Sequence, residues 1–444
     1  MTFEKMLASW LVKQRWFAGK GRTVHDLAVV EDTEIVAGDP ALRHLIVCVS
    51  HGTTVDSYQL FVGVRSKLPA RLRHAFIGAD GGVSVYDGLH DTKLTRPLLG
   101  FMASGATVGS LRFCPVQGAP IETGVDSLVL TGEQSNTSLV FGESAIFKVF
   151  RRLAPGPNPD LEVAAALARL GSPHVAEPYG WIETRMEGAT AVLAILSRYL
   201  KAAADGWSLA ATSVRDLYAS EGTSAANAGG DFAGEAERLG MATAQVHADL
   251  ADAFGTDELQ PDAIRDMAEQ MYRRLDLAIA AVPELARYGD MIGSGYSDLA
   301  KLTEPVPAQR VHGDYHLGQV MRTQTGWVVL DFEGEPASPL ALRRARSSPL
   351  RDVAGMLRSF DYAARHQLIN HPERIRLAVA ASDWVRRNSD AFCAGYAAAG
   401  GQDPSTNSVL LRALVLDKAV YEVMYEARHR PSWLTIPLES LAEM

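Results

Sequence analysis

The sequence predicts an α+β protein with a kinase-like, two-lobed fold and an additional N-terminal subdomain. Strand-like runs dominate the first 200 or so of its 444 residues, and helical periodicity dominates the remainder. A short pair of strand-like runs interrupts these helices near residues 311–331. A chain of this length favours two domains, or one two-lobed protein with an appendage. We therefore divide the chain into residues 1–90, 91–200 and 201–444.

The first part is expected to be a small α+β cap. Its opening helix is amphipathic and is followed by two apolar strand-like runs. The apolar helix positions are Met6, Leu7, Trp10 and Leu11, and the strands are expected at Leu45–Val49 and Tyr58–Val64.

The second part has strands, then a helix, then another strand, which is typical of the N-terminal lobe of a kinase. The strands are expected at Ser127–Leu130, Leu139–Phe141, Ala145–Phe150 and Ala191–Ser197, with the helix at Asp160–Leu170. The third part is mainly helical. Its helices are expected at Gly206–Ser220, Gly234–Phe254, Pro261–Val282, Pro372–Ala399 and Ser408–Arg428.

Composition excludes several classes of protein. Hydrophobic residues make up 47% and charged residues 21%, as in ordinary soluble proteins. A net charge of −9 argues against a nucleic-acid or anionic-membrane partner. The three cysteines lack metal-ligand spacing, and no apolar run approaches the roughly 18 residues of a membrane span. We expect a cytoplasmic protein without a signal peptide.

The segments VHGDYHLGQV and GWVVLDFEGEP carry the strongest functional signal. They are expected to place Asp314, Gln319 and Asp331 at the ends of two neighbouring strands. In kinases, one such acid accepts the proton of the attacking hydroxyl, while an amide and a second acid hold Mg²⁺ on the nucleotide phosphates. This pattern predicts Asp314 as the base and Gln319 and Asp331 as metal ligands. A capping aspartate is the ordinary role of an isolated Asp, and the spacing makes it a poorer explanation here.

A cation for the ATP phosphates is expected at Lys148, within the strand AIFKVF. Glu162, near the start of the next helix, is the expected carboxylate partner, as in the strand-lysine and helix-glutamate pair of kinases. An exposed strand lysine is the ordinary explanation of Lys148 alone. In combination with Glu162 and the downstream acids, a nucleotide role is favoured.

No glycine-rich loop precedes this lysine, and GEQSNTS takes its place. Ser135, Asn136 and Thr137 are expected to offer hydroxyl, amide and N–H groups to phosphate oxygens. A plain polar hairpin turn is the alternative. The adenine is expected against the strand exit, at Ser197, Tyr199 and Leu200.

The C-terminal helix is the candidate acceptor site. Lys418, Tyr421, Tyr425 and Arg428 share one face, with Glu426 beside it. Rings and charged groups of this kind suit a sugar, whereas tyrosines packed in a core are the alternative. His312 is expected either to hold its loop or to contact substrate. Glu333 either supports the metal or is a loop carboxylate.

Several segments together resemble the actinobacterial maltokinases, relatives of the aminoglycoside phosphotransferases. The matching segments are QRWFAG, EQSNTS, FKVFRRLAPGPNPDLE, GWSLAATSVRDL, GGDFAGEAERLG, HGDYHLGQ, LDFEGEP, SPLRDVAGMLRSFDYAA and LDKAVYEVMYEARHRPSWLTIPL. They run nearly end to end. The resemblance implies transfer of the ATP γ-phosphate to the anomeric hydroxyl of maltose, and formation of maltose 1-phosphate for α-glucan synthesis.

The resemblance also implies roles for single residues. It gives Asp314 as base, Gln319 and Asp331 as metal ligands and Lys148 with Glu162 on the phosphates. It places maltose against the C-terminal lobe, which favours Lys418, Tyr421 and Glu426. Association with a trehalose-isomerising enzyme is a further expectation. Tyr315 departs from the family pattern, which has Leu beside the base, so acceptor preference is the property that this departure affects.

Two other functions remain open at this point. A kinase of the same fold that acts on glucosamine or an aminoglycoside is the nearer one. A polycationic antibiotic would need an acidic pocket, and the C-terminal helix mixes Lys418 and Arg428 with its glutamates. A nucleotide-binding pseudokinase scaffold is the other. It would be expected to lack one of the key residues, and all of these are present: Lys148, Asp314, Gln319 and Asp331.

Overall fold

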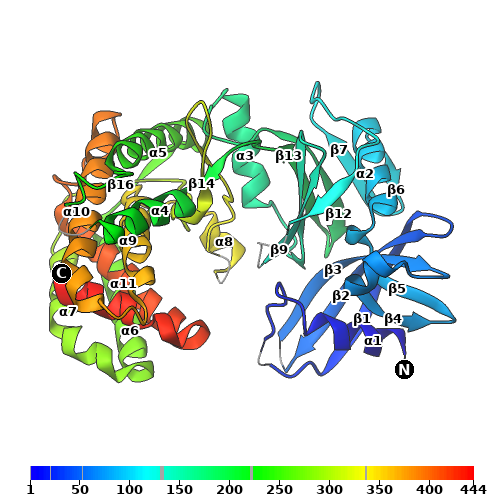
Figure 1. Cartoon of the computed structure of the whole chain (residues 1–444), viewed down its shortest axis with the longest axis horizontal. Helices are drawn as coiled ribbons and strands as arrows, with labels where there is room; N and C mark the ends of the chain where they lie inside the picture. The colour runs from blue at the N-terminus through cyan, green and yellow to red at the C-terminus, as the bar shows by residue number, and fades with distance from the viewer. Residues whose placement is uncertain (1, 21, 53, 131–134, 221–223, 336–337) are drawn as a thin grey trace. The chain divides into compact units, whose positions relative to one another are not determined.

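The computed structural model describes residues 2–20, 22–52, 54–130, 135–220, 224–335 and 338–444. The chain divides into two compact units (Figure 1). Unit 1 contains Met1–Ala165 and Ala176–Lys201, and unit 2 contains Ala166–Val175 and Ala202–Met444.

Unit 1 begins with an antiparallel sheet in the order β1-β2-β3-β5-β4, on which helix α1 packs (Figure 1). Apolar side chains of α1 are buried against this sheet, as its amphipathic pattern predicts. A two-residue strand from later in the chain, β11 (Arg152–Leu153), joins the sheet at β3. The other elements are α1 (Phe3–Leu11), β1 (Asp26–Val36), β2 (Ala41–His51), β3 (Thr54–Arg65), β4 (Phe76–Asp80) and β5 (Val83–Asp87), with 3-10 turns η1 (Ala70–Ala75) and η2 (Gly88–His90).

A second antiparallel sheet in unit 1 has the order β6-β7-β12-β13-β10-β9-β8. Its strands are β6 (Thr107–Val108), β7 (Leu111–Pro115), β8 (Ser127–Val129), β9 (Asn136–Phe141), β10 (Ala145–Phe150), β12 (Pro178–Met186) and β13 (Ala189–Arg198). Strand β9 begins at Asn136, so the end of the expected polar loop belongs to a strand. Gly132, Glu133 and Gln134 of that loop lie outside the described residues.

One hydrophobic core spans both sheets of unit 1. It includes Phe61 from the first sheet, Leu98 from helix α2 and Phe147 from the second sheet. Helix α2 (Thr92–Ser104), which the sequence pattern did not reveal, packs on β7. Helix α3 (Pro159–Arg169) contains the boundary between the units. The cap is therefore continuous with the second sheet in the interior of unit 1.

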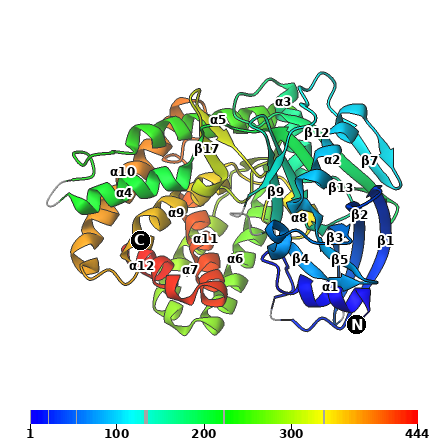
Figure 2. The same ribbon diagram turned by 45° about the vertical axis from the view of Figure 1, so that its right-hand side comes forward.

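Unit 2 is mainly helical, as predicted. Helix α9 lies at its centre, buried along most of its length, and contacts α4, α10 and α11. Helix α10 runs beside α5, and α11 contacts α6 and α7 (Figure 2). The helices are α4 (Gly206–Ala219), α5 (Ala233–Phe254), α6 (Pro261–Ala281), α7 (Gly289–Ala300), α8 (Leu340–Arg343), α9 (Leu350–Arg365), α10 (Arg374–Ala398), α11 (Ser408–His429) and α12 (Thr435–Glu443).

Short strands of unit 2 carry the functional loops. Strands β14 (Ala204–Asp205), β17 (Val320–Arg322) and β18 (Trp327–Val329) form one small sheet, and β15 (Thr256–Leu259) pairs with β16 (Val306–Gln309). The 3-10 turns are η3 (Pro283–Tyr288), η4 (Leu317–Gln319), η5 (His366–Leu368) and η6 (Pro431–Trp433). Among the described residues, we find no helix with the length and apolar character of a membrane span.

Candidate active site

Asp314 lies on the loop between β16 and η4, which we call the catalytic loop (residues 310–316). The sequence predicted it at the end of a strand beside the strand that precedes Asp331. That detail is wrong, because β16 ends at Gln309 and pairs with β15, whereas β18 pairs with β17. The catalytic loop therefore takes its conformation from the surrounding side chains rather than from a sheet.

A buried carboxylate, Asp352 at the start of α9, fixes the backbone of this loop. Its oxygens accept the N–H groups of His312 (2.7 Å) and Gly313 (2.9 Å). The ring nitrogen Nε2 of His247 lies 3.1 Å away. Burial alone would raise the pKa of Asp352, but the hydrogen bond and charge of His247 and the loop N–H groups hold it below its usual range.

The same face of α9 makes two further contacts with the loop region. A Cβ atom at Gly355 would lie 2.5 Å from the carbonyl oxygen of Tyr315, so only glycine permits this approach. The hydroxyl of Ser359 accepts the N–H of Leu317 at 3.0 Å. Asp352, Gly355 and Ser359 recur at helical spacing. That spacing in SPLRDVAGMLRS was the available signal, and the sequence reasoning missed it.

Tyr315 is buried, and its hydroxyl oxygen lies 2.8 Å from Oγ1 of Thr243 on α5. The phenol therefore anchors the loop to a helix of the core. The phenol of this family departure is therefore packed in the interior, against α5.

His312 links the catalytic loop to the segment after β18. Its Nδ1 accepts the N–H of Asp314 (3.3 Å), so its Nε2 carries the proton and donates to the carbonyl of Leu330 (2.8 Å). Both ring nitrogens are engaged with protein groups. The geometry fits the loop-holding role of His312.

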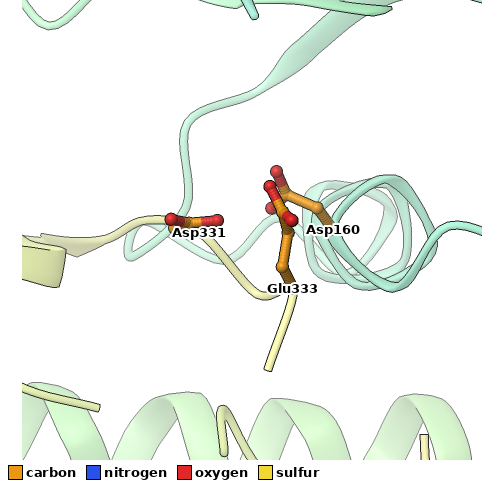
Figure 3. A group of neighbouring side chains, drawn as sticks. All are labelled: Asp160, Asp331 and Glu333. Carbon is orange, nitrogen blue, oxygen red and sulfur yellow. The ribbon is translucent and has the colours of Figure 1, made fainter. Parts of the chain in front are cut away.

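The two predicted metal ligands lie together within unit 2. The pairing of β17 with β18 brings Gln319 and Asp331 close, and Nε2 of Gln319 donates to Oδ2 of Asp331 at 3.2 Å. The amide oxygen of Gln319 and the carboxylate of Asp331 are ligands that suit a hard cation such as Mg²⁺. Asp331 has φ of +63°, a strained conformation common at functional sites. Glu333 follows on the same loop (Figure 3), 4.0 Å from Arg343.

The predicted phosphate-binding lysine has a carboxylate partner within unit 1. Nζ of Lys148 lies 2.8 Å from Oδ2 of Asp160, which projects from the first turn of α3 (Figure 3). The sequence predicted Glu162, which lies in the same turn. Asp160 was missed because Asp160 and Glu162 both lie in the first turn of α3, and the sequence alone does not tell which of these acids contacts Lys148.

Strand register sorts the expected phosphate contacts into two faces. Lys148 pairs with Ser138 and Phe150 with Asn136, so Ser138 and Asn136 share the face of Lys148. Ser138 was not predicted. Thr137 points to the opposite face, where its Oγ1 accepts a hydrogen bond from Nε of Arg151 at 2.7 Å. Ser135 immediately precedes β9.

The expected adenine contacts lie where β13 ends. Ser197 pairs with Ile146 and so shares the face of Lys148. Tyr199 and Leu200 follow the strand, and the N–H of Tyr199 donates to the carbonyl of Ser144 at 2.9 Å.

The predicted acceptor helix, α11, lies beside the catalytic loop. Nζ of Lys418 is 3.5 Å from Oδ1 of Asp314 and 4.9 Å from the ring centroid of Tyr421. Tyr421 stacks on Tyr425 at 6.2 Å. Burial and the nearby Glu335 carboxylate raise the pKa of Tyr421, so its hydroxyl remains a hydrogen-bond donor.

Glu426, also predicted on this surface, is 1% exposed. Its carboxylate accepts hydrogen bonds from Nη2 of Arg430 (2.6 Å) and from the hydroxyl of Tyr362 (3.1 Å). The structure therefore brings Lys418 and Tyr421 to Asp314, and pairs the buried carboxylate of Glu426 with the partly exposed Arg430.

The chain is similar to known sugar kinases over most of its length. A family model described as the maltokinase N-terminal cap domain matches residues 10–91. A glucosamine kinase of Streptacidiphilus jiangxiensis is 33% identical over 340 residues, which cover 74% of this chain and 75% of that protein. A glucosamine kinase of Mycolicibacterium smegmatis (strain ATCC 700084 / mc(2)155) is 28% identical over 320 residues, which cover 69% and 77%.

Among solved structures, a glucosamine kinase in complex with glucosamine, ADP and inorganic phosphate superimposes with a TM-score of 0.68. The match is 24% identical and covers 100% of this chain and 99% of that one. It confirms the predicted kinase-like α+β fold.

Proposed function

The chain belongs to the maltokinase-like family of ATP-dependent sugar kinases, and we propose that its acceptor is maltose. The reaction would transfer the γ-phosphate of ATP to the anomeric hydroxyl and release maltose 1-phosphate and ADP, a product suited to α-glucan synthesis. Association with a trehalose-isomerising enzyme belongs to the same proposal.

Asp314 is the proposed base. Its carboxylate accepts the proton of the anomeric hydroxyl while that oxygen attacks the γ-phosphorus and the bond to the β-phosphate oxygen breaks. The contacts of Asp352 hold the catalytic loop, so the carboxylate of Asp314 is oriented before substrate arrives. Lys148, paired with Asp160, is the proposed cation on the nucleotide phosphates.

Gln319 and Asp331 are the proposed ligands for Mg²⁺. When bound, the ion neutralises charge on the phosphate oxygens. The hydrogen bond between the two side chains turns the amide nitrogen of Gln319 toward the acid and leaves its oxygen for the cation. This orientation fits a metal site and needs no rearrangement of either strand.

The contact of Lys418 with Asp314 is the observation that carries the maltose proposal. An ammonium group 3.5 Å from the base disfavours a cationic acceptor and suits a neutral one, because like charges repel at this range. The stacked rings of Tyr421 and Tyr425 extend from this point and offer apolar surface to a second glucose unit.

Glucosamine is the second candidate, favoured by the similarity to two glucosamine kinases. Its amino group would need a carboxylate beyond the reach of Lys418. Glu335, which lies beside Tyr421, is such a group.

Release of ADP in the presence of ATP and Mg²⁺ tests the proposal, with maltose, glucose, glucosamine, maltotriose and kanamycin as acceptors. Turnover that strongly favours maltose is the expected result. A preference for glucosamine would replace the acceptor and retain the catalytic residues. ATP binding without turnover on any of the five would favour a scaffold.

A further inference from the structure

The cap and the second sheet of unit 1 are joined by one buried arginine. Arg151, between β10 and β11, is 1% exposed. Its Nη2 donates to Oδ2 of Asp87, the last residue of β5, at 2.7 Å. Its guanidinium carbon lies 4.8 Å from the ring centroid of Trp16. Both of these partners belong to the cap.

Another contact of this guanidinium is with the strand expected to bind phosphate. Nε of Arg151 donates to Oγ1 of Thr137 on β9 at 2.7 Å. A buried charge requires good pairing, and the planar guanidinium makes the two bonds in different directions. A lysine could not make both of these hydrogen bonds at once.

The cap end of this connection is itself fixed. The second oxygen of Asp87 accepts the N–H of Leu89 at 3.2 Å, so the carboxylate cannot rotate freely. Beside it, Nε2 of Gln59 donates to the carbonyls of Phe150 and Leu193, at 2.6 Å each. Gln59 is fully buried. The end of β10, next to Arg151, is therefore bonded to the cap through both the backbone and the side chain of Gln59.

Thr137 is flanked by the two residues that face the nucleotide side. Because side chains alternate along a strand, a bond that holds Thr137 from behind also sets the positions of Asn136 and Ser138 in front. We propose that Arg151 is a positioning residue through which the cap holds the phosphate-binding strand for ATP. This rests on the proposed kinase function and gives the cap a role within it.

Thr137→Val tests the proposal, because valine keeps the shape and removes the acceptor of Arg151. The Arg151–Asp87 pair stays intact, so the variant should fold. We expect affinity for ADP, measured by calorimetry, to fall about tenfold, as expected for a lost hydrogen bond to a charged group. The KM for ATP should rise similarly, with the KM for the sugar unchanged. Thr137→Ser, which retains the hydroxyl, should restore both values.

Arg152→Gln is the matched control. Arg152 is the next residue and also pairs with the cap, through Asp56 at 2.6 Å, but its side chain is half exposed and this ion pair involves no residue of β9. It should leave ADP affinity unchanged. Wild-type ADP affinity in Thr137→Val, whatever its melting temperature, would overturn the proposal. A wild-type chain that binds ADP but does not turn over maltose would count against the proposed acceptor. A wild-type chain that does not bind ADP would overturn both this proposal and the proposed kinase function.

Discussion

Asp352 and Asp314 carry the same carboxyl group in opposite surroundings. Asp352 is 1% exposed and accepts hydrogen bonds from backbone N–H groups, so its charge stabilises the conformation of the catalytic loop. The side chain of Asp314 is 26% exposed, with the ammonium of Lys418 at 3.5 Å. Exposure leaves room for an acceptor at Asp314, whereas hydrogen bonds keep Asp352 ionised in spite of its burial.

Replacement of the proposed base should separate chemistry from nucleotide binding. We expect Asp314→Asn to lower kcat by about 10²–10⁴-fold, the usual contribution of a general base, with ADP affinity unchanged. Asp298→Asn, an exposed acid on α7, should leave kcat unaltered. Near-wild-type turnover in Asp314→Asn would show that another group takes the proton.

A buried histidine in the cap should make stability depend on pH. Burial lowers the pKa of His44 from 6.5 to about 4, partly opposed by its hydrogen bond to Gln59. Gln59 uses its nitrogen on two carbonyls, so its oxygen accepts from Nε2 of His44. Between pH 4 and 6.5 the unfolded chain binds more protons, so stability is full above pH 6.5 and falls as the pH drops toward 4.

Urea unfolding at pH 7 and pH 5 measures this effect. The wild type should lose about 2 kcal/mol through His44 between these values. His44→Gln keeps a donor at a similar position and does not titrate, so its loss should be smaller by that amount. Equal losses in the two proteins would show that His44 is not responsible.

At the scale of elements, β10 and α3 together present Lys148 with its carboxylate. Asp160→Asn should raise the KM for ATP by about tenfold or more, because a charge-assisted hydrogen bond orients the lysine. Glu162→Gln is compared in the same assay, and neither variant should change the KM for the sugar. A larger effect of Glu162→Gln than of Asp160→Asn in steady-state kinetics would favour the partner that the sequence predicted.

The same element scale shows what the sequence could and could not predict. Periodicity located most strands and long helices, and motif spacing indicated Lys148, Asp314, Gln319 and Asp331 as candidate site residues. The sequence did not predict contacts between distant segments. The bonds of Asp352 to the catalytic loop and of Arg151 to Asp87 join residues far apart in sequence, and a single chain carries no signal for such pairs. The burial of Glu426 was missed because tyrosine and glutamate at helical spacing fit an exposed face equally well.

At the scale of the whole molecule, the cap is expected to be inseparable from the nucleotide-binding sheet. Deletion of residues 1–90 would expose the apolar core shared by the two sheets and leave Arg151 without Asp87. We expect the truncated chain to be insoluble. A soluble 91–444 fragment that unfolds cooperatively and binds ADP would show that the cap is dispensable for folding.

Strand β11 gives the cap an unusual place in the order of synthesis. The cap leaves the ribosome before β11 does, yet β3 pairs with residues 152–153, and Gln59 bonds the carbonyl of Phe150. The first sheet therefore remains incomplete until synthesis has passed well beyond the last residue of the cap. Stalled nascent chains whose residues 150–153 have not yet left the ribosome should be digested readily by protease in the cap, and longer ones should resist.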